Sequence, residues 1–335
     1  MSRQATPDAL VLTDVTKSFG TFLAVDRLSV RVPAGQILGF LGPNGAGKTT
    51  TIRMVMSINY PDSGSIEILG HPRALDVKDR IGYLPEERGL YRKMTVDQTL
   101  RYFGQLKGLH GAALTHRIGE LLASVGLESW RKKSVESLSK GMQQKIQFIS
   151  TVLHDPELII LDEPFSGLDP LNRDMLENLI VDLRRRGRTV IFSTHQMEQA
   201  ERLCDRILLI HRGRKLIDGT VHDIRSQFPS RRLAFAGEGD FSWLRTLPGV
   251  NDAHITVGAA DVELADGVDT QPIVQEAAER CRLTRFEVIR PSLQEIFVKL
   301  VGDVGDEDTR FESGDGASNV TAGDRRGDQR QGVRP

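Results

Sequence analysis

The strongest constraint on this chain is a glycine-rich turn, GPNGAGKT at residues 42–49, which matches the pattern GxxxxGK[ST] in full. An apolar segment predicted as a short strand, 36–41, precedes it, and a segment predicted as a helix, 49–58, follows it. Glycines let the backbone curl so that successive N–H groups point at phosphate oxygens, and the helix N-terminus adds its dipole. Lys48 should then reach the β- and γ-phosphates, and the Thr49 hydroxyl should bind Mg²⁺. The alternative is a chance glycine-rich turn, against which the strand and the helix argue. The predicted nucleotide-binding residues of this segment are Gly42, Pro43, Asn44, Gly45, Ala46, Gly47, Lys48, Thr49 and Thr50.

Two adjacent acids follow a second apolar segment. Residues 157–161 (ELIIL) are predicted as a buried strand that ends at Asp162 and Glu163. Asp162 is placed to hold Mg²⁺ through water, and Glu163 is placed to polarise an attacking water as the general base. Taken alone, the pair could be solvated carboxylates at a strand end, but the phosphate-binding turn upstream favours the catalytic interpretation.

His195 lies just past another predicted strand, TVIFST, about thirty residues after the two acids. A lone histidine is more often a core or surface residue than a catalytic one. This position, however, suits a contact with the γ-phosphate, so we count His195 with Glu163 and Lys48 among the candidate catalytic residues.

The chain as a whole predicts an α/β fold with two domains. Residues 9–225 read as alternating strands and helices, with a mostly helical stretch at about 92–155. Within that stretch, Thr95 and Gln98 have capping-box spacing, and Ser139 is placed to cap a later helix. A small α+β domain follows at about 231–301, in the order βαββαβ. The tail, 302–335, is nearly free of large apolar residues and is predicted to be disordered.

The composition limits the partners and the cellular compartment that we expect for this chain. The formal net charge of −1 gives no general attraction to nucleic acid, so none is expected as a partner. The two cysteines, Cys204 and Cys281, form no CxxC pair, which favours a reducing cytoplasm. The N-terminus lacks the apolar core of a secretory signal, and no run approaches the ~20 apolar residues that span a bilayer. A membrane role would therefore require a partner that holds the chain there.

Residues 9–225 resemble the ABC ATPase family, and two further segments carry the resemblance. Leu138-Ser139-Lys140-Gly141-Met142 is similar to the family's LSGGQ signature, with Lys140 in place of the first glycine and Met142 in place of the glutamine. In the family this segment caps the nucleotide held by the other subunit, which implies roles for Ser139 and the Gly141 amide. Residues 166–169 (SGLD) resemble the loop that links the two sites.

The resemblance also places Phe19 at the position of the aromatic residue that stacks on adenine; a buried core phenylalanine is the alternative. Glu86 closes the segment GYLPE, which matches the family's lid loop except that glutamine usually stands there. The family's glutamine touches Mg²⁺ and the attacking water, and its loop contacts the membrane subunit. The Glu86 carboxylate could still bind Mg²⁺, although its charge would oppose the γ-phosphate.

The closing segment of the small domain, RPSLQEIF at 290–297, looks like the extension on ATPase subunits of sodium-efflux and drug-efflux exporters, and LPEERGLY at 84–91 is similar to that group too. A simple amphipathic docking helix is the alternative for the closing segment. The resemblance implies an ATP- and Mg²⁺-dependent motor subunit of an exporter. It would lie peripherally on the cytoplasmic face of the membrane, with an integral-membrane permease and a second ABC ATPase subunit, expected to be a second copy, as partners.

Three rivals differ in class: a soluble ABC ATPase acting on ribosomes or DNA, a monomeric P-loop kinase or GTPase, and a nucleotide-sensing regulator. A single phosphate-binding turn without sustained heptads argues against the first. The signature segment and His195 would have no purpose in the second, and Glu163 argues against the third. The small domain has no catalytic motif, so contact between two C-terminal domains is its expected role. The cargo, and a paralogue in place of a second copy, are left open.

Overall fold

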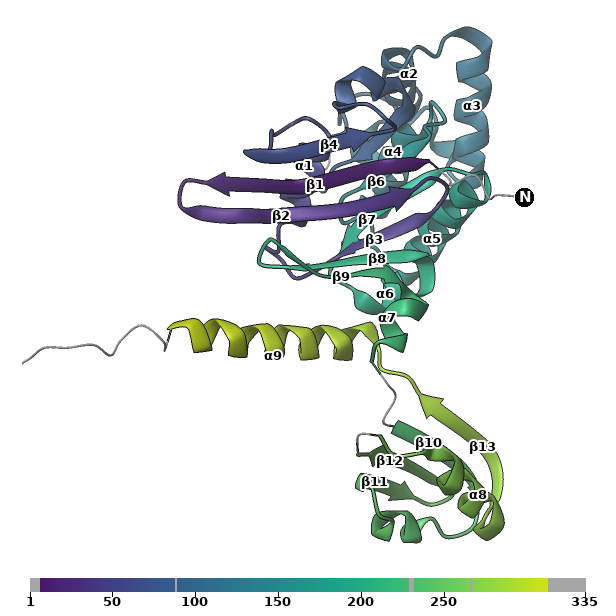
Figure 1. The fold of residues 1–335 in the computed structure, drawn as a ribbon. Coiled ribbons are helices and arrows are strands. Elements are labelled where there is room, and N and C mark those ends of the chain that lie inside the picture. The colour runs from purple at the N-terminus through teal and green to yellow at the C-terminus, as the bar shows by residue number, and fades with distance from the viewer. Residues whose placement is uncertain (1–6, 88, 229–231, 266, 313–335) are drawn as a thin grey trace, which may run out of the picture. The chain divides into compact units, whose positions relative to one another are not determined.

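The fold is described from a computed structural model that covers residues 7–87, 89–228, 232–265 and 267–312, with 303–312 described by backbone alone. It confirms the predicted α/β class. The larger part of the chain has two sheets with helices between and around them, and the small C-terminal part has a sheet of its own (Figure 1). The domain limits given above stay predictions.

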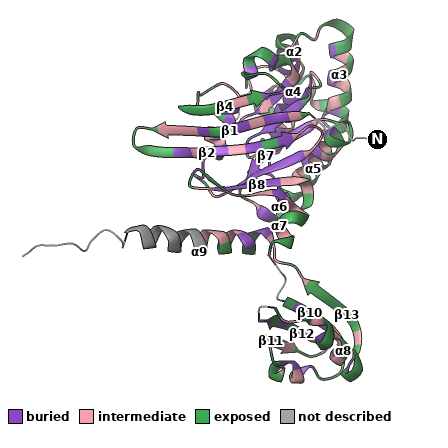
Figure 2. Ribbon diagram, viewed as in Figure 1, coloured by how far each residue is buried: buried purple, intermediate pink, exposed green. Residues whose placement is uncertain are grey.

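A six-stranded sheet forms the centre of the larger part, in the order β5-β6-β7-β3-β8-β9. Neighbouring strands are parallel except for β8 and β9, which are antiparallel. The strands are β3 (Ile37–Leu41), β5 (Ile81–Leu84), β6 (Leu158–Leu161), β7 (Thr189–Thr194), β8 (Arg206–His211) and β9 (Arg214–Thr220). Every residue of β3, β6 and β7 is buried, as expected for parallel strands covered on both faces (Figure 2). The short apolar runs read from the sequence are thus confirmed as strands.

A second, antiparallel sheet was not foreseen. It has the order β2-β1-β4, with β1 (Asp8–Phe19), β2 (Phe22–Pro33) and β4 (Ser63–Ile68). Helix α1 (Lys48–Val55) shares one hydrophobic core with this sheet and one face of the central sheet. The helix ends at Val55 rather than Ile58 because Ser57 adopts a left-handed φ of 55° that closes the last turn.

Further helices include some that pack on the other face of the central sheet, and the first three of them form the helical stretch predicted at about 92–155. The helices here are α2 (Val96–Leu106), α3 (Gly111–Ser124), α4 (Lys140–Val152), α5 (Pro170–Arg185), α6 (Met197–Leu203) and α7 (Val221–Ser226). The capping box at Thr95 and Gln98 is confirmed by hydrogen bonds in both directions, and Ser139 caps α4 as predicted. Helix α4 contributes both to the core under the sheet and to the core it shares with α2 and α3.

The small domain has a four-stranded antiparallel sheet in the order β11-β12-β10-β13. Its elements are β10 (Arg232–Glu238), β11 (Val250–Thr256), β12 (Ala259–Leu264), α8 (Thr270–Arg280) and β13 (Arg282–Ile289). The first predicted helix, 241–247, is a short 3₁₀ turn, Ser242–Thr246. Asp240 binds the Ser242 amide and hydroxyl, and Pro248 follows closely, so too few residues remain to propagate an α-helix.

The last helix, α9 (Leu293–Glu312), extends past the predicted limit at Val301. Its first turns carry an apolar stripe, in which Leu293 and Ile296 are buried. Once a helix is nucleated, each added residue gains one hydrogen bond, which explains helical backbone at 302–312 where disorder was predicted. The rest of the predicted tail, 313–335, lies outside the described residues.

A half-buried histidine joins the end of the helical stretch to the central sheet. His154 follows α4, and its Nε2 lies 3.0 Å from the Ile81 carbonyl oxygen at the start of β5. The Lys107 ammonium approaches the same carbonyl, at 3.2 Å. Burial, with the Lys107 charge as second cause, lowers the pKa of His154 to about 4.

This pKa predicts an acid-sensitive fold. As pH falls from about 6.5 to about 4, the unfolded chain binds a proton at His154 before the folded chain does, so the free energy of unfolding should fall across that window. We expect a loss of about 2 kcal/mol after discounting for partial exposure. His154→Gln, which can still donate to Ile81, should flatten the pH dependence measured by urea unfolding. His116→Gln, at an exposed position on α3, should leave it as in the parent, and equal slopes for all three proteins would contradict the assignment.

Candidate nucleotide-binding site

The glycine-rich turn is held in a conformation that only glycine adopts easily. Gly42, Gly45 and Gly47 have φ values of 154°, 80° and 104°. A Cβ on Gly47 would lie 2.5 Å from the Ala24 carbonyl oxygen, and one on Gly42 would lie 2.4 Å from the Ile210 carbonyl oxygen. The turn therefore needs glycine both for its dihedral angles and for its close approach to β2 and β8.

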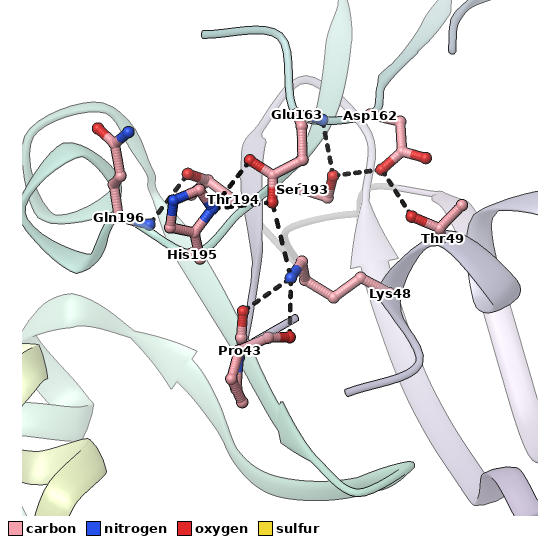
Figure 3. A network of polar contacts seen from close by, with 10 residues as sticks. Pro43, Lys48, Thr49, Asp162, Glu163, Ser193, Thr194, His195 and Gln196 are labelled. Atoms are coloured by element: carbon pink, nitrogen blue, oxygen red, sulfur yellow. Dashed lines mark hydrogen bonds and ion pairs between the residues drawn. The ribbon is translucent and has the colours of Figure 1, made fainter. Parts of the chain in front are cut away.

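Lys48 begins α1 and folds back over the turn (Figure 3). Its ammonium donates to the carbonyl oxygens of Gly42, at 2.7 Å, and Pro43, at 3.1 Å. It also lies 3.6 Å from Glu163 Oε1. Only 6% of the Lys48 side chain is exposed, so its charge acts in a poorly hydrated setting where electrostatic interactions are strong.

Asp162 sits at the end of β6 and is almost fully buried. Its Oδ1 accepts hydrogen bonds from the Ser193 hydroxyl, at 2.6 Å, and the Thr49 hydroxyl, at 3.3 Å (Figure 3). Its Oδ2 is also buried and has no hydrogen-bond partner in the described part of the chain. A buried carboxylate oxygen left in this way favours a water or a cation as its missing partner.

Glu163 follows Asp162 directly in the sequence, but its carboxylate points in a different direction. Its φ of 47° lies in the left-handed region, which is uncommon for a residue with a side chain and turns the carboxylate away from the strand direction. The Ser193 hydroxyl accepts a hydrogen bond from the Glu163 amide at 2.9 Å, which fixes the backbone there. Nδ1 of His195, just past the end of β7, lies 3.2 Å from Glu163 Oε1.

These groups border a cavity of about 470 Å³. Nine of the residues predicted from the sequence line it: Asn44, Gly45, Gly47, Lys48, Thr49, Thr50, Glu86, Glu163 and His195. Its described lining does not include Gly42, Pro43 or Ala46, which belong to the same turn. It does include Phe22, Ala24 and Ser166.

Phe19 and Phe22 face each other in register across the hairpin of β1 and β2, and both are well exposed. The Lys17 ammonium lies 5.5 Å from the centre of the Phe19 ring. Phe22 lines the cavity, whereas Phe19 does not. Because the two residues are paired, either ring is a candidate for stacking on a base, although the sequence indicated Phe19 alone.

A smaller hollow of about 150 Å³ adjoins the two acids on the side of α4, and Glu86 borders both spaces. Gln147 of α4 donates to the Glu87 carbonyl at 3.2 Å, and Gln144 donates to the Pro164 carbonyl. Both glutamines are buried. One helix thus holds both the loop that carries Glu86 and the segment that follows Glu163.

The signature residues lie at the start of the same helix. The Ser139 hydroxyl accepts a hydrogen bond from the Met142 amide at 3.3 Å. Gly141 packs closely on Asn172, because a Cβ on Gly141 would lie 2.9 Å from the side-chain amide nitrogen of Asn172. The described lining of the cavity includes neither Ser139 nor Gly141. Within one chain the structure does not bring these two residues to the site.

Comparison with known proteins connects this geometry to a family. Residues 25–166 match the family model for "ABC transporter". The chain is 39% identical over 295 residues to the ABC transporter ATP-binding protein YhaQ of Bacillus subtilis, covering 88% of this chain and 99% of that protein. The chain belongs to the ABC transporter ATP-binding protein family. It is therefore an ATP-binding subunit of an ABC transporter, and such subunits work with membrane permease subunits.

Three further matches refine this placement in the ABC family. Residues 219–301 match the model for the C-terminal domain of DrrA1-3-like ATP-binding proteins. The chain is also 41% identical over 225 residues to a Nod factor export ATP-binding protein I of Sinorhizobium fredii, covering 66% of each chain. A solved structure of an "ATP binding subunit of ABC transporter" is 33% identical, with a TM-score of 0.61, covering 66% of this chain and 93% of that one.

Ser193 is a buried site residue that sequence reasoning missed, as it missed Phe22 at the cavity. Ser193 links Asp162 and Glu163 with one hydroxyl, and it is fully buried. The available signal was a polar residue near the end of the apolar strand TVIFST, which becomes meaningful only because β7 pairs with β6.

We predict that Ser193→Ala lowers the ATP turnover rate about tenfold while the KM for ATP changes little, because the acids lose their alignment and the phosphate-binding turn does not. The free energy of unfolding should fall by roughly 1–3 kcal/mol, since a buried acceptor loses its donor. Thr189→Val is the matched control: the Thr189 hydroxyl accepts from the Gly35 amide at the opposite end of β7. It should cost stability without lowering turnover, and a Ser193→Ala enzyme with parental turnover would contradict the positioning role.

Proposed function

We propose that this chain is the ATP-hydrolysing motor subunit of an ABC-type exporter. The observation that carries the proposal is the convergence of Lys48, Glu163 and His195 at one cavity, with Glu163 within 3.6 Å of both of the others. Lys48 supplies positive charge for the β- and γ-phosphates, and Glu163 supplies a carboxylate beside them. A protein that only bound ATP would not require the Glu163 carboxylate at this position.

The residues present also fit Mg²⁺. The Thr49 hydroxyl and the unpartnered Asp162 Oδ2 are oxygen donors of the kind Mg²⁺ prefers, and Glu86 is a third oxygen donor at the cavity. No group of three or more His, Cys, Asp or Glu residues that could hold a metal occurs in the described part of the chain. Mg²⁺ usually keeps several waters and shares phosphate oxygens, so few protein ligands suffice. When bound, it would neutralise phosphate charge.

The chain's own residues divide the remaining work. Glu163 accepts the proton of the attacking water and orients it toward the γ-phosphate. His195 is hydrogen-bonded to Glu163 and half exposed, so it can contact the γ-phosphate while steadying the base. Phe19 or its neighbour Phe22 stacks on the adenine, and the turn from Gly42 to Thr50 holds the phosphates through its amides.

The second half of the site comes from a second copy. Ser139 and Gly141 lie at the N-terminus of α4, where free amides and the helix dipole favour an anion, yet they do not line the cavity of their own chain. In a head-to-tail dimer they cap the γ-phosphate held by the other copy. ATP therefore stabilises the closed dimer, and hydrolysis allows it to open.

Export and membrane coupling rest on the relatives and on the loop at Glu86. A relative named for Nod factor export matches over 225 residues, and residues 219–301 match the DrrA1-3-like model. Among the described residues, no helix is both long and apolar enough to span a bilayer. We place the chain peripherally on the cytoplasmic face of the membrane, held by a permease subunit that contacts the lid loop.

Hydrolysis and dimer closure can be tested together. Glu163→Gln should lower ATP turnover by at least 100-fold while ATP binding is kept, because the base is lost and the phosphate cradle is not. In ATP and Mg²⁺ this variant should sediment as a dimer, and without nucleotide the parent chain should sediment mainly as a monomer. Lys48→Ala should instead weaken ATP binding itself.

Arg53→Ala, on the same helix α1 but outside the cavity lining, is the control and should keep parental turnover. Normal turnover by Glu163→Gln would contradict the assignment of the base. A Glu163→Gln chain that stays monomeric at saturating ATP would contradict the homodimer and leave a paralogue as the partner.

The transport part makes a separate prediction. A gene for a multi-span membrane protein should lie beside the gene for this chain, and the two products should co-purify from detergent when expressed together. The chain expressed alone should remain in the supernatant after membranes are pelleted. Equal recovery in the membrane pellet with and without that permease would contradict permease-dependent attachment.

A further inference from the structure

The small domain has an edge strand that does not look like a protected edge. β13 ends the sheet order β11-β12-β10-β13 and pairs only with β10 among the described strands (Figure 1). Six of its eight residues are exposed (Figure 2). Phe286 and Val288 are 37% and 41% exposed, although both are large and apolar.

The opposite edge shows the contrast. β11 has a register shift between Val250 and Asp252, and Asn251, Asp252 and His254 are exposed along it. Bulges and polar residues are the usual means by which an edge strand avoids pairing with another chain. β13 also has a register shift, at Thr284, but its residues 285–289 pair one to one with β10 and carry the exposed apolar side chains Phe286 and Val288.

Phe286 and Val288 continue the core of the small domain to this edge. In register they lie opposite Phe235 and Leu233 of β10, which are buried. The Phe286 and Phe235 ring centres are 5.4 Å apart. The core therefore stops at β13 with its last row of side chains half covered, and a further strand alongside would complete it.

The sequence of β13 is self-complementary about its central phenylalanine, and on this basis we propose that β13 of one copy pairs antiparallel with β13 of a second copy, with the two-fold axis at Phe286. In that register Arg285 of each copy stands opposite Glu287 of the other. Thr284, at the register shift of β13, stands opposite Val288 of the other copy. The result is one continuous sheet built from the two four-stranded sheets.

The charges select this register. Arg285 and Glu287 already form an ion pair within one strand, with 68% and 49% of their side chains exposed. An axis moved to Arg285 would set two arginines opposite each other, and one moved to Glu287 would set two glutamates opposite each other. Exposed pairs add little affinity, but like charges directly opposite disfavour the wrong registers.

The occupant is a second copy because only a second copy supplies the matching order of charges by symmetry. One pair of strands buries less surface than a stable interface requires, so this contact acts together with the ATP-bound cassettes. Tethering by the rest of the dimer raises the effective concentration of one β13 at the other. The pairing deepens the proposed homodimer, but it does not depend on hydrolysis.

Cysteine cross-linking of the full chain tests the register. Phe286→Cys lies on the axis and should form a disulfide with itself, because Cα atoms directly opposite are about 4.5–5.5 Å apart. Thr284→Cys alone and Val288→Cys alone should not cross-link, since each lies about 13 Å from its own copy along the strand. An equal mixture of those two variants should cross-link. The parent chain, whose Cys204 and Cys281 are not exposed, and His254→Cys at the opposite edge are the controls.

Charge reversal tests the same pairing without cysteines. Arg285→Glu and Glu287→Arg should each raise the dissociation constant of the dimer about tenfold in sedimentation with ATP and Mg²⁺. An equal mixture of the two should restore parental affinity, because the hybrid has opposite charges at both pairs. ATP binding by each variant, which needs the phosphate-binding turn of one copy only, reports whether the cassette is folded.

Three results would overturn the proposal: no Phe286→Cys cross-link in a folded chain, cross-linking of Thr284→Cys with itself as strong as that of the mixture, or no effect of the charge reversals. These are separable from failure of the proposed function. Cross-links at Phe286→Cys in a chain whose Glu163→Gln form never closes on ATP would support β13 pairing and reject the ATP sandwich.

Discussion

The site depends on one buried carboxylate. Asp162 places a negative charge at the end of a strand with almost no exposure to solvent, and it is stable there because hydroxyl groups from α1 and β7 donate to it. The same contacts join three elements that are far apart in the sequence. Its charge is felt nearby: burial, with Asp162 as the second cause, raises the pKa of Tyr83 to about 12. Helix α1, β6 and β7 therefore hold their positions as a unit.

Much of this arrangement was readable in the sequence because it follows from local rules. The turn at 42–49 has a spacing that few other structures require, and the runs before Asp162 and His195 are too short and too apolar to be anything but buried strands. Parallel strands bring their carboxyl ends to one edge, so three separate motifs converge without any knowledge of long-range pairing. The cap at Ser139 is equally local.

What the sequence did not reveal is non-local. The importance of Ser193 appears only when β7 lies beside β6, and the role of Phe22 only when the hairpin of β1 and β2 lies over the turn. The hairpin of β1 and β2, which turns at Gly20 and Thr21, was overlooked, and the pairing of β1 with β4 joins segments that are far apart in the sequence. The 3₁₀ turn at Ser242–Thr246 was mistaken for a helix because periodicity over so few residues does not separate the two. The self-complementary edge at β13 likewise needed the strand order.

Helix α4 has a mechanical consequence. The helix begins beside Ser139, and two turns later the Gln147 side chain donates a hydrogen bond to the Glu87 carbonyl oxygen. At 1.5 Å per residue these two points lie about 12 Å apart on a single rigid rod. Gln144 lies between them and donates a hydrogen bond to the Pro164 carbonyl oxygen, directly after Glu163. A displacement of the loop at Glu87 would therefore be passed along α4 to its first turn at Ser139. Because α4 is also packed in two hydrophobic cores, it would carry those cores with it.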